Sequence, residues 1–200
     1  MGIGASRYRT ETALSLLREV KITVIRGNAS ELRILLKELT GKNAGSGNDS
    51  VSPTRGVDAS FSDEIREDTL ESLTVATRAL SAATGSVTVM TGAIDIASNG
   101  EETWLIRNGC PQMSRITGSG CMLDGIIAAY IASTGPAPSS MPFSRRPLLP
   151  RLLPVSAGNG QQKKAEQTLS GTGSFRCCFL DEVSLLDEDT LKGGINIEVS

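Results

Sequence analysis

The residues best suited to chemistry lie at positions 115–123, where the chain reads Arg-Ile-Thr-Gly-Ser-Gly-Cys-Met-Leu. Glycines allow several backbone N–H groups to converge on one point, and the start of a helix adds a positive partial charge. Gly118, Ser119, Gly120 and Cys121 therefore form a candidate anion hole suited to phosphate. Cys121 would lie in the first helical turn, where a thiolate is favoured.

An ordinary glycine-containing loop before a buried helix explains the segment 115–123 about equally well, with Cys121 as a small core residue. The segment is not a Walker A loop, because no lysine follows the second glycine.

A second group of candidates follows a short β-branched stretch, Ile22-Thr23-Val24-Ile25. Arg26 could meet a phosphate at the carboxyl end of this strand, where open α/β sheets bind ligands. Glu31 could reach a metal-bound water, but Asn28 and Glu31 also have the spacing of a helix capping box, which is the commoner explanation. Thr91 ends another predicted strand before a glycine, which by itself indicates little.

Composition excludes several kinds of chemistry. The chain of 200 residues contains no histidine, so Ser-His-Asp or Cys-His catalysis and histidine-bound zinc are excluded. A net charge of −2 argues against a nucleic-acid partner, and no apolar run is long enough to span a membrane. The four cysteines form no C-x-x-C pair, so we expect a cytoplasmic protein with free thiols.

Hydrophobic periodicity predicts an α/β fold with a largely parallel sheet. We expect helices at 10–20, 30–40, 60–83 and 120–133, and strands at 22–25, 86–91, 94–97 and 103–106. From Phe175 we expect a strand running into a helix or loop. These elements must hold the candidate residues at the ends of the strands.

Taken together and in order, the motifs identify a family. These are residues 24–31, Arg55-Gly56-Val57-Asp58, residues 89–95 (Val-Met-Thr-Gly-Ala-Ile-Asp), Asn108-Gly109 and residues 115–123. The combination resembles hydroxyethylthiazole kinase, a member of the ribokinase-like superfamily, over residues 2–134 and more loosely over 165–197. The resemblance implies a ribokinase-like three-layer fold and an ATP-dependent phosphotransferase. The substrate would be the primary hydroxyl of 4-methyl-5-(2-hydroxyethyl)thiazole, in thiamine biosynthesis or salvage.

The resemblance also implies roles for individual residues. Arg26 and Thr91 would contact ATP, and Gly118 would contact the substrate. Asn28 and Glu31 would help to hold Mg²⁺ through its waters. Cys121 takes the position where most of the superfamily has an aspartate base, and we expect it to position the hydroxyl more than to remove its proton, because a thiolate is a weak base for an alcohol. The partners would be ATP, the thiazole alcohol and further copies of the chain, since the family is typically trimeric.

Three departures from the family lead to further expectations. The chain lacks the family's N-terminal portion, including an Asp-Pro-Val-Gly stretch before Gly2, so we expect one partial kinase domain over 1–200 that is incomplete at its N-terminus. The stretch 136–160 is rich in proline, arginine and leucine where the family has an alanine-rich helix, and we hypothesise a compensated frameshift there. The predicted loop 42–54 is longer than the family's connection.

The function has two alternatives to thiazole phosphorylation. The chain would be an inactive remnant or binding module, or it would be another ribokinase-like small-alcohol kinase.

Overall fold

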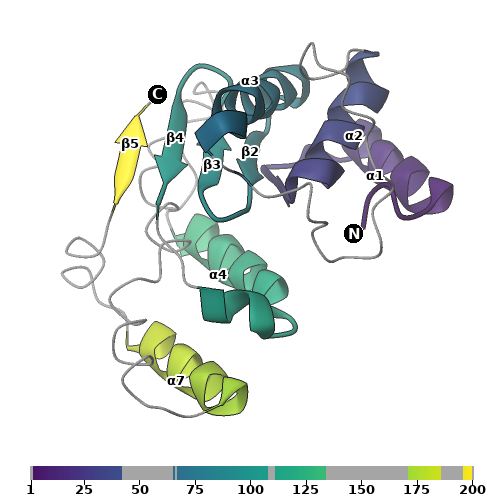
Figure 1. The fold of residues 1–200 in the computed structure, drawn as a ribbon. Coiled ribbons are helices and arrows are strands. Elements are labelled where there is room, and N and C mark those ends of the chain that lie inside the picture. Colours follow the sequence, from purple (N-terminus) through teal and green to yellow (C-terminus); the bar gives the residue numbers. More distant parts are fainter. Residues whose placement is uncertain are drawn as a thin grey trace. The chain divides into compact units, whose positions relative to one another are not determined.

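The computed structural model describes residues 2–41, 65, 67–107, 111–133, 171–185 and 196–199. The chain divides into two compact units, and we describe each by itself. The first contains Met1–Leu105, and the second contains the helices that follow (Figure 1). The expectations for 42–58, 108–110, 136–160 and the connection to Phe175 lie outside the described residues.

The first helix, α1 (Arg7–Glu19), begins three residues earlier than the sequence predicts. Ser6 is its N-cap, because the Ser6 side chain accepts a hydrogen bond from the Arg9 N–H. Thr10, where the sequence predicts the helix to begin, instead lies inside the helix, and its hydroxyl accepts a hydrogen bond from the Gly4 N–H at 3.1 Å. The prediction missed the boundary because both residue types cap helices well.

The next elements agree with the predicted pattern wherever they are described, whereas the predicted start of the helix over 60–83 lies outside the described residues. Strand β1 (Val24–Gly27) leads directly into α2 (Ala29–Thr40), which ends at Gly41 in the left-handed conformation, with φ of 65°. Helix α3 (Glu67–Thr84) ends before Gly85, whose φ is 67°. Glycine adopts this backbone conformation without the steric cost that a Cβ imposes, which explains both helix ends.

Five strands form one sheet in the order β1-β2-β3-β4-β5. The further strands are β2 (Val87–Met90), β3 (Asp95–Ser98), β4 (Thr103–Ile106) and β5 (Ile197–Val199), the last of which the sequence did not predict. β1 and β2 pair in parallel, as expected, but β2 and β3 pair antiparallel. The four residues between β2 and β3 are too few for the crossover that parallel neighbours need, so the expectation of a largely parallel sheet is confirmed only at β1 and β2.

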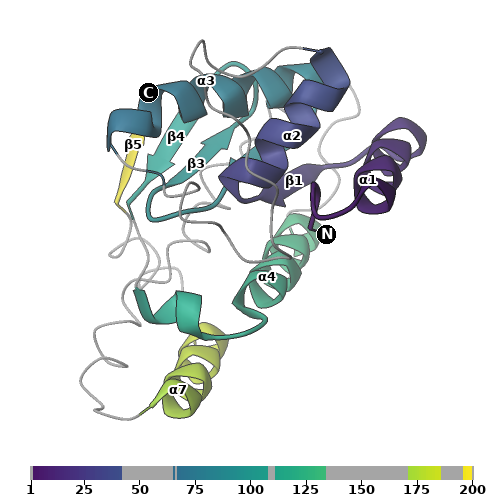
Figure 2. The same ribbon diagram turned by 45° about the vertical axis from the view of Figure 1, so that its right-hand side comes forward.

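Helices α2 and α3 lie along one face of the sheet (Figure 2). Alternate strand residues, including Ile25, Met90 and Ile96, belong to the hydrophobic core that these helices complete. Leu32, Leu35 and Leu80, each with at most 2% of its surface exposed, come from the helices. Because strand side chains alternate between faces, Arg26, Val89 and Ala97 face the opposite side.

The second unit contains a 3₁₀ turn, η2 (Pro111–Arg115), followed by α4 (Ser119–Ser133) and α7 (Thr172–Ser184). The start of α4 agrees with the prediction to within one residue. The strand expected from Phe175 is wrong, because residues 172–184 are helical. Phe175, Cys178 and Phe179 have helical spacing, and Phe175 packs with Ile116 while its ring stacks on that of Phe179 at a centroid distance of 6.5 Å.

Within the residues that the structure describes, no helix combines the length and the apolar character needed to cross a membrane.

Candidate functional site

Arg26 and Thr91 lie near the carboxyl ends of the parallel neighbours β1 and β2. Arg26 pairs with Val89, and Gly27 pairs with Met90. The Thr91 N–H donates to the Gly27 carbonyl at 2.9 Å, and the Thr91 hydroxyl lies 3.3 Å from the same oxygen. Since side chains two residues apart on a strand share a face, this register places Arg26 and Thr91 on the same side of the sheet. The two residues predicted to contact ATP are therefore brought together.

Asp95 is a further ionisable group at this edge of the sheet, and its sequence motif alone predicts no role for it. Only 8% of its surface is exposed, and its Oδ1 accepts a hydrogen bond from the Gly92 N–H at 2.9 Å. Burial raises the pKa of the Asp95 carboxyl to about 7, although the Gly92 hydrogen bond and the Arg26 charge act in the opposite direction. The spacing Thr91-Gly92-x-x-Asp95 is the sequence feature that could have predicted this hydrogen bond, since an aspartate commonly accepts a hydrogen bond from a nearby turn N–H.

Gly92 also makes close contact with Ile65, which precedes α3. A Cβ on Gly92 would lie 2.7 Å from both Cγ1 and Cδ1 of Ile65. Ile65 is 2% exposed and belongs to the main core, so it has little room to move. The turn after β2 is therefore fixed by its neighbour strand, by Asp95 and by the core.

Asn28 and Glu31 form a capping box at the start of α2. The Asn28 side chain accepts from the Glu31 N–H at 2.9 Å, and Glu31 Oε2 accepts from the Asn28 N–H at 3.2 Å. The other carboxylate oxygen, Oε1, accepts from the N–H groups of Gly2 and Ile3 at 2.8 and 3.3 Å. The capping explanation of this spacing is thus confirmed, and Glu31 additionally anchors the segment before α1.

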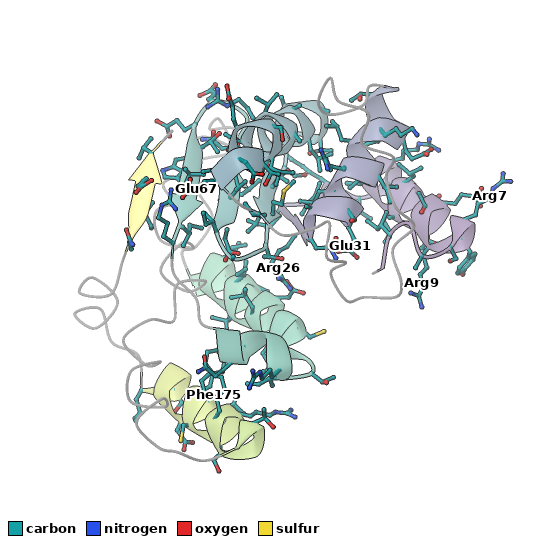
Figure 3. The ribbon with its side chains drawn as sticks, in the orientation of Figure 1. Arg7, Arg9, Arg26, Glu31, Glu67 and Phe175 are labelled. Carbon is teal, nitrogen blue, oxygen red and sulfur yellow. The ribbon has the colours of Figure 1, made fainter. Side chains whose placement is uncertain are left out.

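Gly27 allows the Glu31 carboxylate to lie this close to the end of β1. A Cβ at position 27 would be 3.0 Å from Glu31 Oε2 and 3.1 Å from Leu32 Cδ2. Arg26 belongs to the end of β1 and Glu31 to the first turn of α2, and both side chains are labelled in Figure 3. The glycine between them lets a cation and an acid occupy one short connection.

The donor set at Asn28 and Glu31 does not fit direct ligation of Mg²⁺. Mg²⁺ prefers oxygen ligands in near-octahedral geometry. Both Glu31 oxygens and the Asn28 carbonyl already accept N–H groups. Among the residues that the structure describes, no group of three or more acidic or thiol side chains is placed to hold a metal. A contact through a coordinated water is the arrangement that leaves these hydrogen bonds intact.

The predicted anion hole lies in the second unit, at the start of α4. Gly118 has a φ of 86°, and its carbonyl accepts the Met122 N–H at 3.0 Å, as at a helix start. The Ser119 N–H points back to the Ile116 carbonyl at 3.4 Å, so this donor already has a long intrachain partner. Cys121 is exposed and its thiol is not in a disulfide.

The structure thus brings Arg26, Asn28, Glu31 and Thr91 together at the strand ends of the first unit. Gly118, Ser119, Gly120 and Cys121 lie together in the second unit. In the first group, a cation and a hydroxyl can bind an anion. In the second group, the backbone N–H groups of a glycine-rich helix start can bind an anion beside a thiol.

Comparisons with known proteins match the chain to one family. Residues 1–189 match the model of the hydroxyethylthiazole kinase family. A hydroxyethylthiazole kinase from Clostridium acetobutylicum is 40% identical over 99% of this chain and 66% of its own length. One from Desulfovibrio desulfuricans is 40% identical over 94% of this chain and 62% of its own length. This chain therefore spans just under two thirds of the length of these relatives.

A solved structure of a hydroxyethylthiazole kinase protein from Pyrococcus horikoshii OT3 has a similar fold. It superposes with a TM-score of 0.70 at 22% identity, covering 100% of this chain and 63% of that one. The expected α/β fold class is confirmed.

Proposed function

Because the chain belongs to the hydroxyethylthiazole kinase family, we propose that it transfers the γ-phosphate of ATP to the primary hydroxyl of 4-methyl-5-(2-hydroxyethyl)thiazole, or forms the larger part of a protein that does so. The observation that carries the proposal is the pairing of β1 with β2, which brings Arg26 and Thr91 to one face of the sheet. Ligands of open α/β sheets bind outside the carboxyl ends of parallel strands. The product would enter thiamine biosynthesis or salvage.

Arg26 and Thr91 would bind the nucleotide. An arginine holds phosphate oxygens with paired, charge-assisted N–H donors, which a lysine cannot reproduce in the same geometry. The Thr91 hydroxyl lies 3.3 Å from the Gly27 carbonyl, and on nucleotide binding its proton would turn from that carbonyl to a phosphate oxygen. Together the two side chains would fix the position of the phosphates relative to β1 and β2.

Gly118, Ser119, Gly120 and Cys121 would stabilise the transferring phosphoryl group and position the substrate. Phosphoryl transfer depends mainly on positioning and charge stabilisation, which backbone N–H groups at a helix start supply. Gly118 would also contact the thiazole alcohol. The exposed Cys121 thiol would orient the hydroxyl, acting as a weak base at most.

Mg²⁺, a cytoplasmic location and a homotrimeric state complete the proposal. Mg²⁺ would supply charge neutralisation on the ATP phosphates, and Glu31 would reach it only through a water, keeping its own hydrogen bonds. The trimer rests on the family resemblance, and the location rests on the pattern of the cysteines. Sedimentation of the purified chain tests the oligomeric state.

The experiment is a thiazole-phosphorylation assay on this chain and on a version extended at its N-terminus. ATP, Mg²⁺ and the thiazole alcohol are supplied, and thiazole phosphate is detected by mass. Arg26→Gln should lose most activity, whereas Arg9→Gln, an exposed change on α1, should not. Phosphorylation of another small alcohol in place of the thiazole would favour a different ribokinase-like kinase. ATP binding without transfer by either version would favour a binding module.

A further inference from the structure

Among the described residues, the carboxyl of Asp95 is a buried ionisable group that the proposed function does not use. It lies at the start of β3 and is 8% exposed. Burial of an ionisable group is costly unless the group has a partner. Among the described residues, the Gly92 N–H donates to Oδ1 at 2.9 Å, and the charge of Arg26 acts on the carboxyl from β1.

The strand register places Asp95 on the same face as the nucleotide-binding candidates. Arg26 pairs with Val89, and Val89 pairs with Ala97 on the next strand. Thr91 and Asp95 lie two residues from Val89 and Ala97 respectively, so their side chains share that face. Arg26, Thr91 and Asp95 therefore form a row across β1, the end of β2 and the start of β3, away from α2 and α3.

Arg26 is the charged group that acts on Asp95 from the strands beside it. β2, the turn at residues 91–94, the rest of β3 and β4 contain no other titratable side chain. α3 packs on the opposite face of the sheet (Figure 2). Ile65, which packs on the turn, is apolar.

We propose that Asp95 is a positioning residue, whose carboxylate orients the Arg26 guanidinium towards a nucleotide phosphate and fixes the Thr91–Gly92 backbone beside it. This inference rests on the proposed function, because it assumes that Arg26 and Thr91 bind ATP. An arginine has five N–H donors in a rigid plane. One edge can pair with Asp95 while another meets a phosphate, which restricts the side chain before the ligand arrives and so reduces the entropy lost on binding.

The orientation of Arg26 by the Asp95 carboxylate should depend on pH. With a pKa of about 7, the group is a carboxylate above neutral pH and a neutral acid below it. Asparagine has nearly the same shape, still accepts the Gly92 hydrogen bond and carries no charge. Asp95→Asn should therefore resemble the wild type at about pH 6 and differ from it at about pH 8.

The first measurement is ATP affinity, obtained by displacing a fluorescent ATP analogue between about pH 6 and pH 8.5. We expect Asp95→Asn to bind ATP about 10-fold more weakly at pH 8, the size of one charge-assisted hydrogen bond, and the ratio to approach one at pH 6. Glu102→Gln, the same change at an exposed carboxyl near β4, should match the wild type throughout. Taking the ratio cancels the protonation of ATP itself. Equal affinities at pH 8, or a ratio that does not change with pH, would overturn the proposal.

The second measurement needs no nucleotide. The NMR signal of the Arg26 side-chain N–H should titrate with a midpoint near pH 7 in the wild type and Glu102→Gln, but not in Asp95→Asn. The same behaviour in all three proteins would refute orientation of Arg26 by Asp95. If none of the three proteins binds ATP, the proposed function fails. The claim that Arg26 is oriented towards a nucleotide phosphate then fails with it. The Arg26 titration then still decides whether Asp95 orients the arginine.

Discussion

Glu31 Oε1 accepts a hydrogen bond from the backbone N–H of Gly2 at 2.8 Å, across 29 residues of sequence. The same carboxylate closes the capping box of α2 through Asn28. One buried side chain therefore ties the segment before α1 to the start of α2, and the end of β1 lies between them. The acid that the sequence offers as a water-mediated metal contact is also a structural anchor.

Glu31→Gln should destabilise the chain. An amide presents one acceptor and one donor, so either the Asn28 N–H or the N–H groups of Gly2 and Ile3 would face another N–H. We expect a loss of about 2 kcal/mol in the free energy of unfolding, from charge-assisted hydrogen bonds that are no longer made. Urea denaturation measures it, with Glu38→Gln on the exposed side of α2 as the control. Equal midpoints for the two variants would contradict the anchoring role.

Gly92→Ala should destabilise the turn after β2. The new methyl group would lie 2.7 Å from Ile65, which is buried and cannot withdraw freely. Overpacking of this kind costs about 1–3 kcal/mol. Adding Ile65→Ala should recover part of the loss that the two single changes cause separately, which a double-mutant cycle in urea would detect. Strictly additive losses would show that the contact with Ile65 is not the cause.

Gly118→Ala should lower activity because alanine is strained in the backbone conformation of Gly118, and not because the new methyl group clashes with a neighbour. Its φ of 86° disfavours a side chain, yet no atom of the described residues, its chain neighbours aside, lies within 4 Å of an added Cβ. Gly41→Ala is a matched control, because Gly41 also has a positive φ, of 65°, and open space around it, but lies at the end of α2. Each change should cost about 1 kcal/mol of stability, and only Gly118→Ala should reduce thiazole phosphorylation. Equal activities would remove Gly118 from the site.

Cys121→Ser should reduce turnover only in part. If the thiol orients the substrate hydroxyl, a serine hydroxyl keeps some of that contact, and the phosphate-stabilising backbone is unchanged. Cys177→Ser, also at an exposed free thiol, is the control. Steady-state kinetics on variants with unchanged circular dichroism measure the effect. Complete loss of turnover would instead indicate that Cys121 is an essential base.

Asp95→Asn should stabilise the fold at high pH. The folded-state pKa of about 7 lies above the ordinary value of 3.8, so the folded chain binds the proton more tightly than the unfolded chain does. Wild-type stability should then fall as pH rises from about 4 to 7, by an amount on the order of a few kcal/mol. Asp95→Asn, which cannot ionise, should lose this dependence and unfold at higher urea than the wild type at pH 8. A wild-type profile that rises over this window would contradict the raised pKa.

The sequence was sufficient for the local features of the first unit. Leucine periodicity and a terminal glycine located α2 to within one residue, and a β-branched run located β1 to within two. The spacing of Asn28 and Glu31 was enough to predict their capping box, because both partners lie within one helical turn. Arg26 and Thr91 could be named from motifs, and the match of residues 1–189 to the family model agrees with the resemblance on which they rested.

Only the tertiary structure decided how these pieces meet. The antiparallel pairing of β2 with β3 was missed although their short connection already excludes a parallel crossover. The addition of β5 was not foreseen because it joins strands that are distant in the sequence. Residues 172–184 form a helix and not the expected strand, and Phe175 of this helix packs with Ile116. The additional bonds of Glu31 to Gly2 and Ile3, and the burial of Asp95 on the Arg26 face, likewise depend on groups brought together across the sheet. The types of residue present limited the chemistry, and the strand register selected which of them can act together.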